Sequence, residues 1–315
     1  MRCVNLALLC LAAACASRSP TETAMKTLME ATSTTRPGRA VALPCDWPVG
    51  TTAHYRYERW SQDSRTPGLE QVTSVSPATL TVLGPDRLSF DIGPTELTGP
   101  PHLISAAQAM LAGFDLSPME LVLQDGVLVD VANREALMTE VLTMTRAMLP
   151  PDTPPEALRM VEGMYADPAS ATQLLLKEPN ILLAGLCTVM GDGERVEQVI
   201  EIPGLAGGPN LRSITAIDAE LRLDEGTATY TFTTIIDPES LGAAAEHFMK
   251  SFTPAEGEAM PPLPLPEHQS VMIAVYSLAD GLPVSVDATQ TTLVRVGDLE
   301  TRHEERGRWT RLPAP

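Results

Sequence analysis

The chain has 315 residues, of which 44% are hydrophobic, and its 40 acidic against 22 basic residues give a formal net charge of -18 at pH 7. The hydrophobic fraction is typical of a folded globular protein with a sizeable core, which argues against a disordered chain. The negative charge would repel phosphate backbones and anionic membrane surfaces, so we expect no nucleic-acid partner.

The sequence opens with a pattern typical of an export signal. Arg2 is followed by an apolar run from Val4 to Leu11 and by small residues at 12–16. A basic start, a short apolar stretch and small residues, in this order, predict a signal peptide over residues 1–16. The apolar run is too short to be a stable membrane span.

Two ways of processing this signal stay open. Ala14-Cys15-Ala16 fits an ordinary cleavage site, whereas Leu11 to Cys15 resembles a bacterial lipobox in which Cys15 becomes lipidated. Ala12 departs from the lipobox pattern, because Leu is preferred at its position. Both interpretations predict an exported protein, which is periplasmic, anchored in the outer membrane or extracellular. The membrane would be touched only through the lipid on Cys15.

Three of the five cysteines lie in this signal, and Cys45 and Cys187 remain. Disulfides persist outside the cytosol, so we expect these two residues to be bonded, with two buried thiols as the alternative. Closing so long a loop would stabilise the fold by roughly 4 to 5 kcal/mol in the chain-entropy model.

Residues 17–44 are rich in Thr, Ser, Ala and Arg and show no sustained hydrophobic period, which predicts a flexible tether. A single folded domain is expected over residues 45–315. Alternating apolar residues predict antiparallel strands near its start, at 54–60, 71–83 and 87–92.

The segment around Asp125-Gly126 changes its period from strand to turn, back to strand, and then to helix. Asp-Gly favours a tight hairpin, which predicts strands at 120–123 and 127–131. Asn133 is expected to be the N-cap of the helix that follows, and Pro150-Pro151 ends that helix.

This helix is the first of an insertion predicted over about residues 133–190. Thr153-Pro-Pro-Glu156 is a capping box with Pro at the first helical position, and a third helix is expected from Asp167 to Leu176. Ile181 to Met190 is apolar throughout, and periodicity does not decide between a helix and a buried strand there.

The second half of the chain returns to strands, predicted at 214–223, 227–236, 269–278, 282–296 and 299–312. A helix from Asp237 to Phe252 and an extended polyproline segment from Pro261 to Pro266 lie between them. Strands outnumber helices, and most helices form one block. This order predicts an α+β fold with one large antiparallel sheet and a block of inserted helices covering one face.

Catalytic and metal-binding signatures are missing from the sequence. It has no G-x-S-x-G elbow, no Walker loop and no H-E-x-x-H motif, and its five histidines are scattered. Acidic residues beside turns, such as Asp125 and Asp224, are explained by turn chemistry without a calcium ion. We therefore expect a non-enzymatic protein without cofactor or metal.

Methionines are concentrated on the first two inserted helices, where flexible thioethers would suit a surface that adapts to apolar ligands. The predicted ligand-lining residues are Leu137, Val141, Met144, Met148, Met160 and Met164. The alternative is that these helices simply pack on the sheet.

The layout over Cys45 to Leu312, with a long antiparallel sheet and helices inserted between strand groups, resembles the half-barrel lipoprotein carriers of the LolA/LolB and mycobacterial LppX type. The Asp-Gly hairpins also resemble those of many uncharacterised secreted bacterial proteins. The carrier resemblance implies a curved, half-barrel-like sheet that encloses, with its helices, an apolar cavity for acyl chains. It includes no motif that would transfer the role of a residue.

Export, layout and methionine content favour a non-enzymatic cell-envelope protein that holds a lipid or other apolar ligand between sheet and helices. A second hypothesis is an interaction or assembly module that offers Pro261 to Pro266 or a sheet edge to other envelope proteins. A third is a hydrolase whose nucleophile and base meet only on folding.

Overall fold

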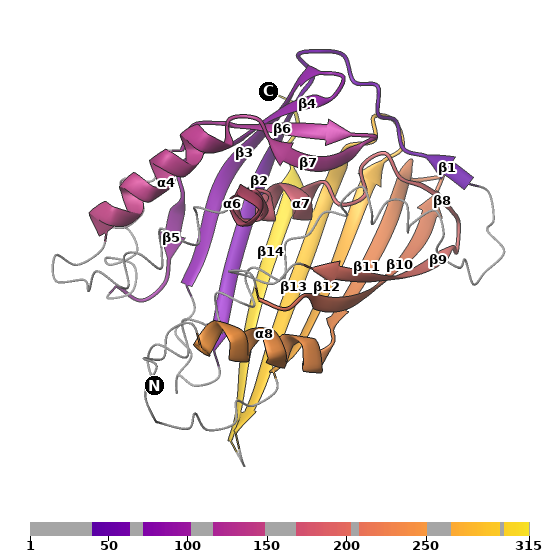
Figure 1. Cartoon of the computed structure of the whole chain (residues 1–315). Coiled ribbons are helices and arrows are strands. Elements are labelled where there is room, and N and C mark those ends of the chain that lie inside the picture. Colours follow the sequence, from indigo (N-terminus) through magenta and orange to yellow (C-terminus); the bar gives the residue numbers. More distant parts are fainter. Residues whose placement is uncertain are drawn as a thin grey trace, which may run out of the picture.

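The computed structural model describes residues 40–63, 72–101, 116–148, 168–202, 208–250, 266–296 and 299–314. Its main feature is a 12-stranded antiparallel sheet that curls partway around the helices (Figure 1). Hydrogen-bonded neighbours follow the order β7-β6-β4-β3-β2-β14-β13-β12-β11-β10-β9, and β5 pairs with β3. The large sheet confirms the predicted α+β class.

The strands fall into an N-terminal and a C-terminal group. The first group is β2 Thr52–Asp63, β3 Val72–Gly84, β4 Arg87–Ile92, β5 Glu96–Thr98, β6 Met119–Gln124 and β7 Val127–Val131. The second is β9 Arg195–Ile202, β10 Leu211–Arg222, β11 Thr227–Ile236, β12 Pro266–Ser277, β13 Pro283–Val296 and β14 Leu299–Arg311. Every predicted strand is confirmed, whereas β9 and the short β5 were not predicted.

The described helices gather on one side of the sheet, which we call its inner face (Figure 1). They are α4 Arg134–Met148, α6 Pro168–Leu175, α7 Lys177–Leu182 and α8 Pro238–Lys250. Helix α7 contacts β13, while α8 contacts β10 and β12 near the other end of the strands. Two further strands, β1 Ala40–Ala42 and β8 Val189–Gly191, form a separate two-stranded sheet.

Two apolar clusters lie on this inner face. The larger cluster contains the fully buried Trp309, Tyr55, Tyr230, Tyr276 and Phe90 together with leucines of α4, α6 and α7. Tyr57 stacks on Trp309 with the ring centroids 3.9 Å apart. The smaller cluster joins α8 to the sheet through Leu211, Ile236, Leu241, Ala244 and Ala245. The larger cluster holds most of the aromatic side chains that the structure describes.

The hairpin and the helix start at Asn133 form as predicted, but the Asn133 side chain has a different role. Its carbonyl oxygen accepts a 3.2 Å bond from the N–H of Leu137, which places Asn133 at the N-cap position. Its side chain accepts a 2.9 Å bond from the N–H of Glu120 and donates a 2.9 Å bond to the carbonyl of Pro118. The amide thus ties the start of β6 to the start of α4 instead of capping the helix.

Two predicted boundaries need correction. The folded part begins before Cys45, because β1 pairs with β8 and Leu43 is buried in the main core. Residues 40–44 therefore belong to the fold and not to a tether. The apolar run from Ile181 to Met190 is neither one helix nor one strand: α7 ends at Leu182, a turn follows, and β8 begins at Val189.

Several predictions concern residues outside the described ranges. These are the signal with Cys15, the tether up to residue 39, the helix expected after Thr153 and the polyproline segment up to residue 265. Among the described helices, none combines the length and the apolar character needed to cross a membrane.

Candidate functional site

A partly open cavity of about 280 Å³ lies on the inner face of the sheet. On one side it is bounded by α7 and β8, and on the other side by strands β9 to β13. Its floor is built by alternate residues of the strands, because successive side chains of a strand point to opposite faces of a sheet. In β9 these are Val196, Gln198 and Ile200, and in β11 they are Tyr230, Phe232 and Thr234.

An apolar row crosses this floor at right angles to the strands. The strand registers place Val196 opposite Ile217, Ile217 opposite Phe232, Phe232 opposite Met272, and Met272 opposite Ala288. All five side chains line the cavity, one from each of five neighbouring strands. This row offers a continuous surface to an apolar molecule.

A polar row runs beside the apolar row, two residues along each strand. It consists of Gln198, Thr215, Thr234, Ser270 and Gln290, again in direct register across β9 to β13. The hydroxyls of Thr215 and Thr234 lie 2.9 Å apart. We call these residues the polar row. The floor of the cavity is therefore amphipathic, with uncharged hydroxyl and amide groups beside an apolar strip.

The roof of the cavity is formed by α7, the turn after it and β8, which contribute Ile181, Ala184 and Met190. Gly185 allows this segment to approach the sheet closely. A Cβ atom at Gly185 would lie 2.8 Å from the ring of Tyr230 and 2.9 Å from that of Tyr276. The N–H of Gly185 also donates a 2.8 Å bond to the Tyr276 hydroxyl. A larger residue could not lie this close to the rings.

A disulfide fixes the roof, as predicted for Cys45 and Cys187, whose Cα atoms lie 5.4 Å apart. Cys187 directly precedes Thr188, which lines the cavity and whose carbonyl accepts a 3.2 Å bond from the N–H of Leu43. The Asp125-Gly126 turn packs on the same bond, since a Cβ at Gly126 would lie 2.7 Å from the Cys187 sulfur. Hairpin, disulfide and roof are thus in contact.

Buried polar atoms without a hydrogen-bond partner among the described residues occur in the cavity lining. They include the Oε1 atom of Gln198, a residue that is 7% exposed, and the hydroxyl of Tyr230, which is fully buried. Burial raises the pKa of Tyr230 to about 12, so its hydroxyl keeps its proton. Buried polar groups usually find a partner, and these two atoms of lining residues are buried without one in the described part of the chain.

Glu194 is the one charged residue among the described residues that line the cavity. Its carboxylate accepts a 2.6 Å bond from the N–H of Gly191. Beyond the end of the polar row, Glu305 lies opposite Gln290 in the β13–β14 register. Oε1 of Glu305 lies 2.7 Å from Nη2 of Arg59 and 3.7 Å from Nζ of Lys177. Arg59 and Lys177 therefore lie beside a carboxylate and do not line the cavity.

The hydrolase hypothesis requires a nucleophile beside a base. One hydroxyl and one imidazole do lie together, but outside the cavity lining. Nδ1 of His268 lies 2.9 Å from the hydroxyl of Thr292, and both residues are buried. Burial lowers the pKa of His268 to about 4, which makes its imidazole a weak base at neutral pH. No group of three or more potential metal ligands forms within the described ranges.

The residues predicted to line a ligand site lie elsewhere. Leu137 and Val141 are buried in the main core, and Met144 is half-buried on α4; none of the three lines the cavity. Met160, Met164 and the side chain of Met148 lie outside what the structure describes. Contact of these residues with a ligand stays a prediction, while the cavity itself lies under α7.

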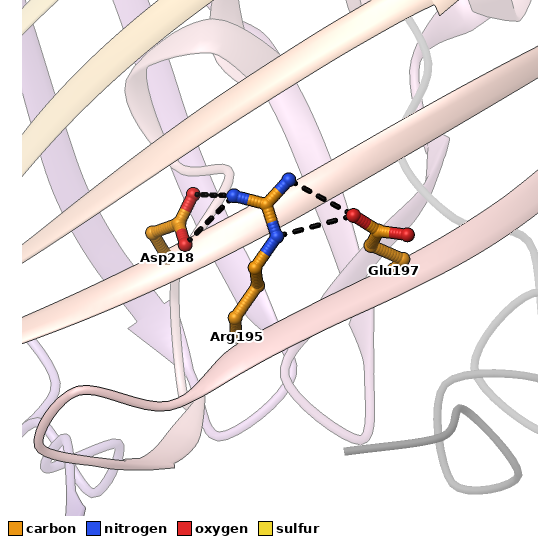
Figure 2. A network of polar contacts seen from close by, with 3 residues as sticks. All are labelled: Arg195, Glu197 and Asp218. Atoms are coloured by element: carbon orange, nitrogen blue, oxygen red, sulfur yellow. Dashed lines mark hydrogen bonds and ion pairs between the residues drawn. The ribbon is translucent and has the colours of Figure 1, made fainter. Parts of the chain in front are cut away.

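The outer face of the same strands carries an ion-pair network (Figure 2). Nη1 of Arg195 lies 3.1 and 3.0 Å from the two carboxylate oxygens of Asp218, and Nη2 lies 2.9 Å from Glu197. Arg195 and Asp218 are directly opposite in the β9–β10 register. Solvent screening makes such an exposed network a weak source of stability, but it favours one register of the edge strand that carries Gln198.

Comparison with known proteins leaves the family open. No family model and no curated protein matches the chain. A solved structure titled "Lipid-protein interactions in lipovitellin" is similar over 86% of this chain, with a TM-score of 0.40 and 11% sequence identity. The match covers 26% of the lipovitellin chain, so this chain spans about a quarter of its length. A likeness at this level supports no conclusion about function.

Proposed function

We propose that this protein is a non-enzymatic exported envelope protein that binds one small lipid or other apolar ligand in the cavity beneath α7. The observation that supports this most is the floor of the cavity, where an unbroken apolar row from Val196 to Ala288 lies open to a space of about 280 Å³. A folded protein normally fills such a surface with side chains, and pockets that remain are default ligand sites.

The size of the cavity limits the ligand. Pockets for drug-sized molecules have volumes of roughly 300–1,000 Å³, and this cavity of about 280 Å³ lies just below that range. A single medium-length acyl chain with a small head group is therefore a better candidate than a two-chain lipid. The carrier role implied by the LolA/LolB and LppX resemblance stays part of this proposal, with the ligand under α7 and β8 instead of under α4.

Fluorescence of N-phenyl-1-naphthylamine, a neutral apolar probe, tests the proposal directly. We expect saturable binding to the purified protein at one site per chain. Ala184→Phe extends a ring from the roof into the cavity and should abolish most of this binding. Ala279→Phe, at an exposed position outside the cavity lining, is the matched control and should bind the probe as the unchanged protein does.

Failure of the unchanged protein to bind the probe saturably would refute the proposal, and so would full binding by the Ala184→Phe variant. Export is tested separately by mass spectrometry of the protein recovered from cells. A mature chain that starts at lipid-modified Cys15 or just after Ala16 supports export, whereas a chain retaining residues 1–16 contradicts it.

A further inference from the structure

We infer that the ligand of this cavity carries an uncharged, hydroxyl-bearing head group that is bound by the polar row, as in a monoacylglycerol. This inference rests on the proposed function and names the chemical class of its ligand. It excludes free fatty acids as preferred ligands, although they carry the same apolar chain.

The first argument is the chemistry of the polar row. Its five side chains are two amides and three hydroxyls, and they offer both donors and acceptors without any charge. The Thr215 and Thr234 hydroxyls lie 2.9 Å apart, so one of them donates to the other. The second O–H donor and the remaining acceptor sites stay available to a ligand. Such a row matches a diol or polyol, whose hydroxyls also donate and accept.

The second argument is the buried amide of Gln198. Gln198 lines the cavity and is 7% exposed, and its buried Oε1 atom has no hydrogen-bond partner among the described residues. A rotation about the last torsion of this side chain would turn the oxygen toward the cavity, where a ligand hydroxyl would donate to it, whereas an ionised carboxylate has no proton to donate. The Gln198 position thus favours a donor in the head group.

The third argument is the charge of the cavity. Among the described lining residues Glu194 alone is charged, and Arg59 lies 2.7 Å from Glu305 outside the lining. A bound carboxylate would be desolvated near another carboxylate, with no cation in the described lining to pair with it, which is costly. An uncharged head group avoids this cost and still uses the polar row.

The experiment is competition for the N-phenyl-1-naphthylamine site at neutral pH with two ligands that share a decanoyl chain. Monodecanoylglycerol should displace the probe at concentrations about tenfold lower than decanoate does. The two ligands differ only in the head group, so this ratio measures what the hydrogen-bonded head group contributes to binding. The double variant Thr215→Val with Thr234→Val removes the hydroxyl pair at almost constant shape. It should lose most of this preference while its affinity for the probe stays within about twofold.

Thr231→Val with Thr233→Val, on the outer face of β11, is the matched control and should keep the preference. Displacement by decanoate at equal or lower concentration than monodecanoylglycerol would overturn the inference and leave the proposed function standing. An unchanged preference in the Thr215 and Thr234 variant would overturn it as well. Absence of probe binding to the unchanged protein would instead refute the proposed function itself.

Discussion

At the scale of single residues, burial shifts the pKa of His268 within the range of ordinary pH. It is 4% exposed, and its Nδ1 lies 2.9 Å from the Thr292 hydroxyl. Loss of hydration lowers its pKa from 6.5 to about 4, against the smaller opposing effect of Glu305 and with a small contribution from Lys177. The folded protein therefore holds this imidazole neutral where the unfolded chain would protonate it.

This difference predicts an acid-sensitive fold. Between pH 6.5 and about 4 the unfolded state binds a proton at His268 that the folded state does not, so stability falls as the pH drops through this window. The loss at the acid end is roughly 3 kcal/mol. Urea unfolding of His268→Gln should show a flatter dependence on pH than the unchanged protein over this window. Equal slopes in both proteins would contradict the prediction.

At the scale of elements, the disulfide holds β1 and β8 over the cavity. Cys45 follows β1, Cys187 precedes β8, and the two strands pair with each other. The turn at Asp125-Gly126, where the period of the sequence changes, packs on this bond. The disulfide therefore reinforces a short ladder, in which β1 and β8 pair over three residues.

Replacing both cysteines by serine should destabilise the protein by about 5 kcal/mol in the chain-entropy model, because the bond joins residues 142 positions apart. Hydrogen exchange should accelerate most in β1 and β8, since their pairing loses its anchor. Treating the unchanged protein with a reductant should reproduce both effects. A urea midpoint that is the same with and without the bond would contradict this prediction.

The sequence contained enough information for the hairpins but not for the cavity. Asp125-Gly126 and the alternating Thr and aromatic residues of β11 predicted their strands correctly, because turn chemistry and period 2 are local properties. The strand β9 was missed, although Val196 and Ile200 alternate with the charged Arg195 and Glu197. That alternation is the signal that could have found it.

The cavity could not be predicted, because its two rows take one residue from each of five strands. Thr215, Thr234 and Ser270 look like ordinary strand residues, and only the register of β10, β11 and β12 aligns them. Helical spacing drew attention to Leu137 and Val141 instead, and tertiary packing uses both in the core. Local patterns identify faces, whereas binding sites depend on which faces meet.

At the scale of the whole molecule, a net charge of -18 at pH 7 creates repulsion that the compact state must overcome. Raising NaCl from about 0.01 M to about 0.1 M shortens the screening length from about 30 Å to about 10 Å. We expect the melting temperature to rise by roughly 2 °C, equivalent to about 1 kcal/mol for a protein of this size. Scanning calorimetry at both salt concentrations measures this. A lower melting temperature in salt would mean that surface ion pairs outweigh the repulsion.

The pairing of β2 with β14 has a kinetic consequence. The N-terminal strands and the C-terminal strands each connect mostly to sequence neighbours, and the register of Tyr57 with Trp309 joins the two groups. Contacts between residues so distant in sequence close late and slow the overall rate of folding. The stacked Tyr57 and Trp309 rings lie at this seam. In a Trp47→Phe, Trp60→Phe variant, whose one tryptophan is Trp309, stopped-flow refolding should show the fluorescence change lagging behind the circular dichroism of the strands.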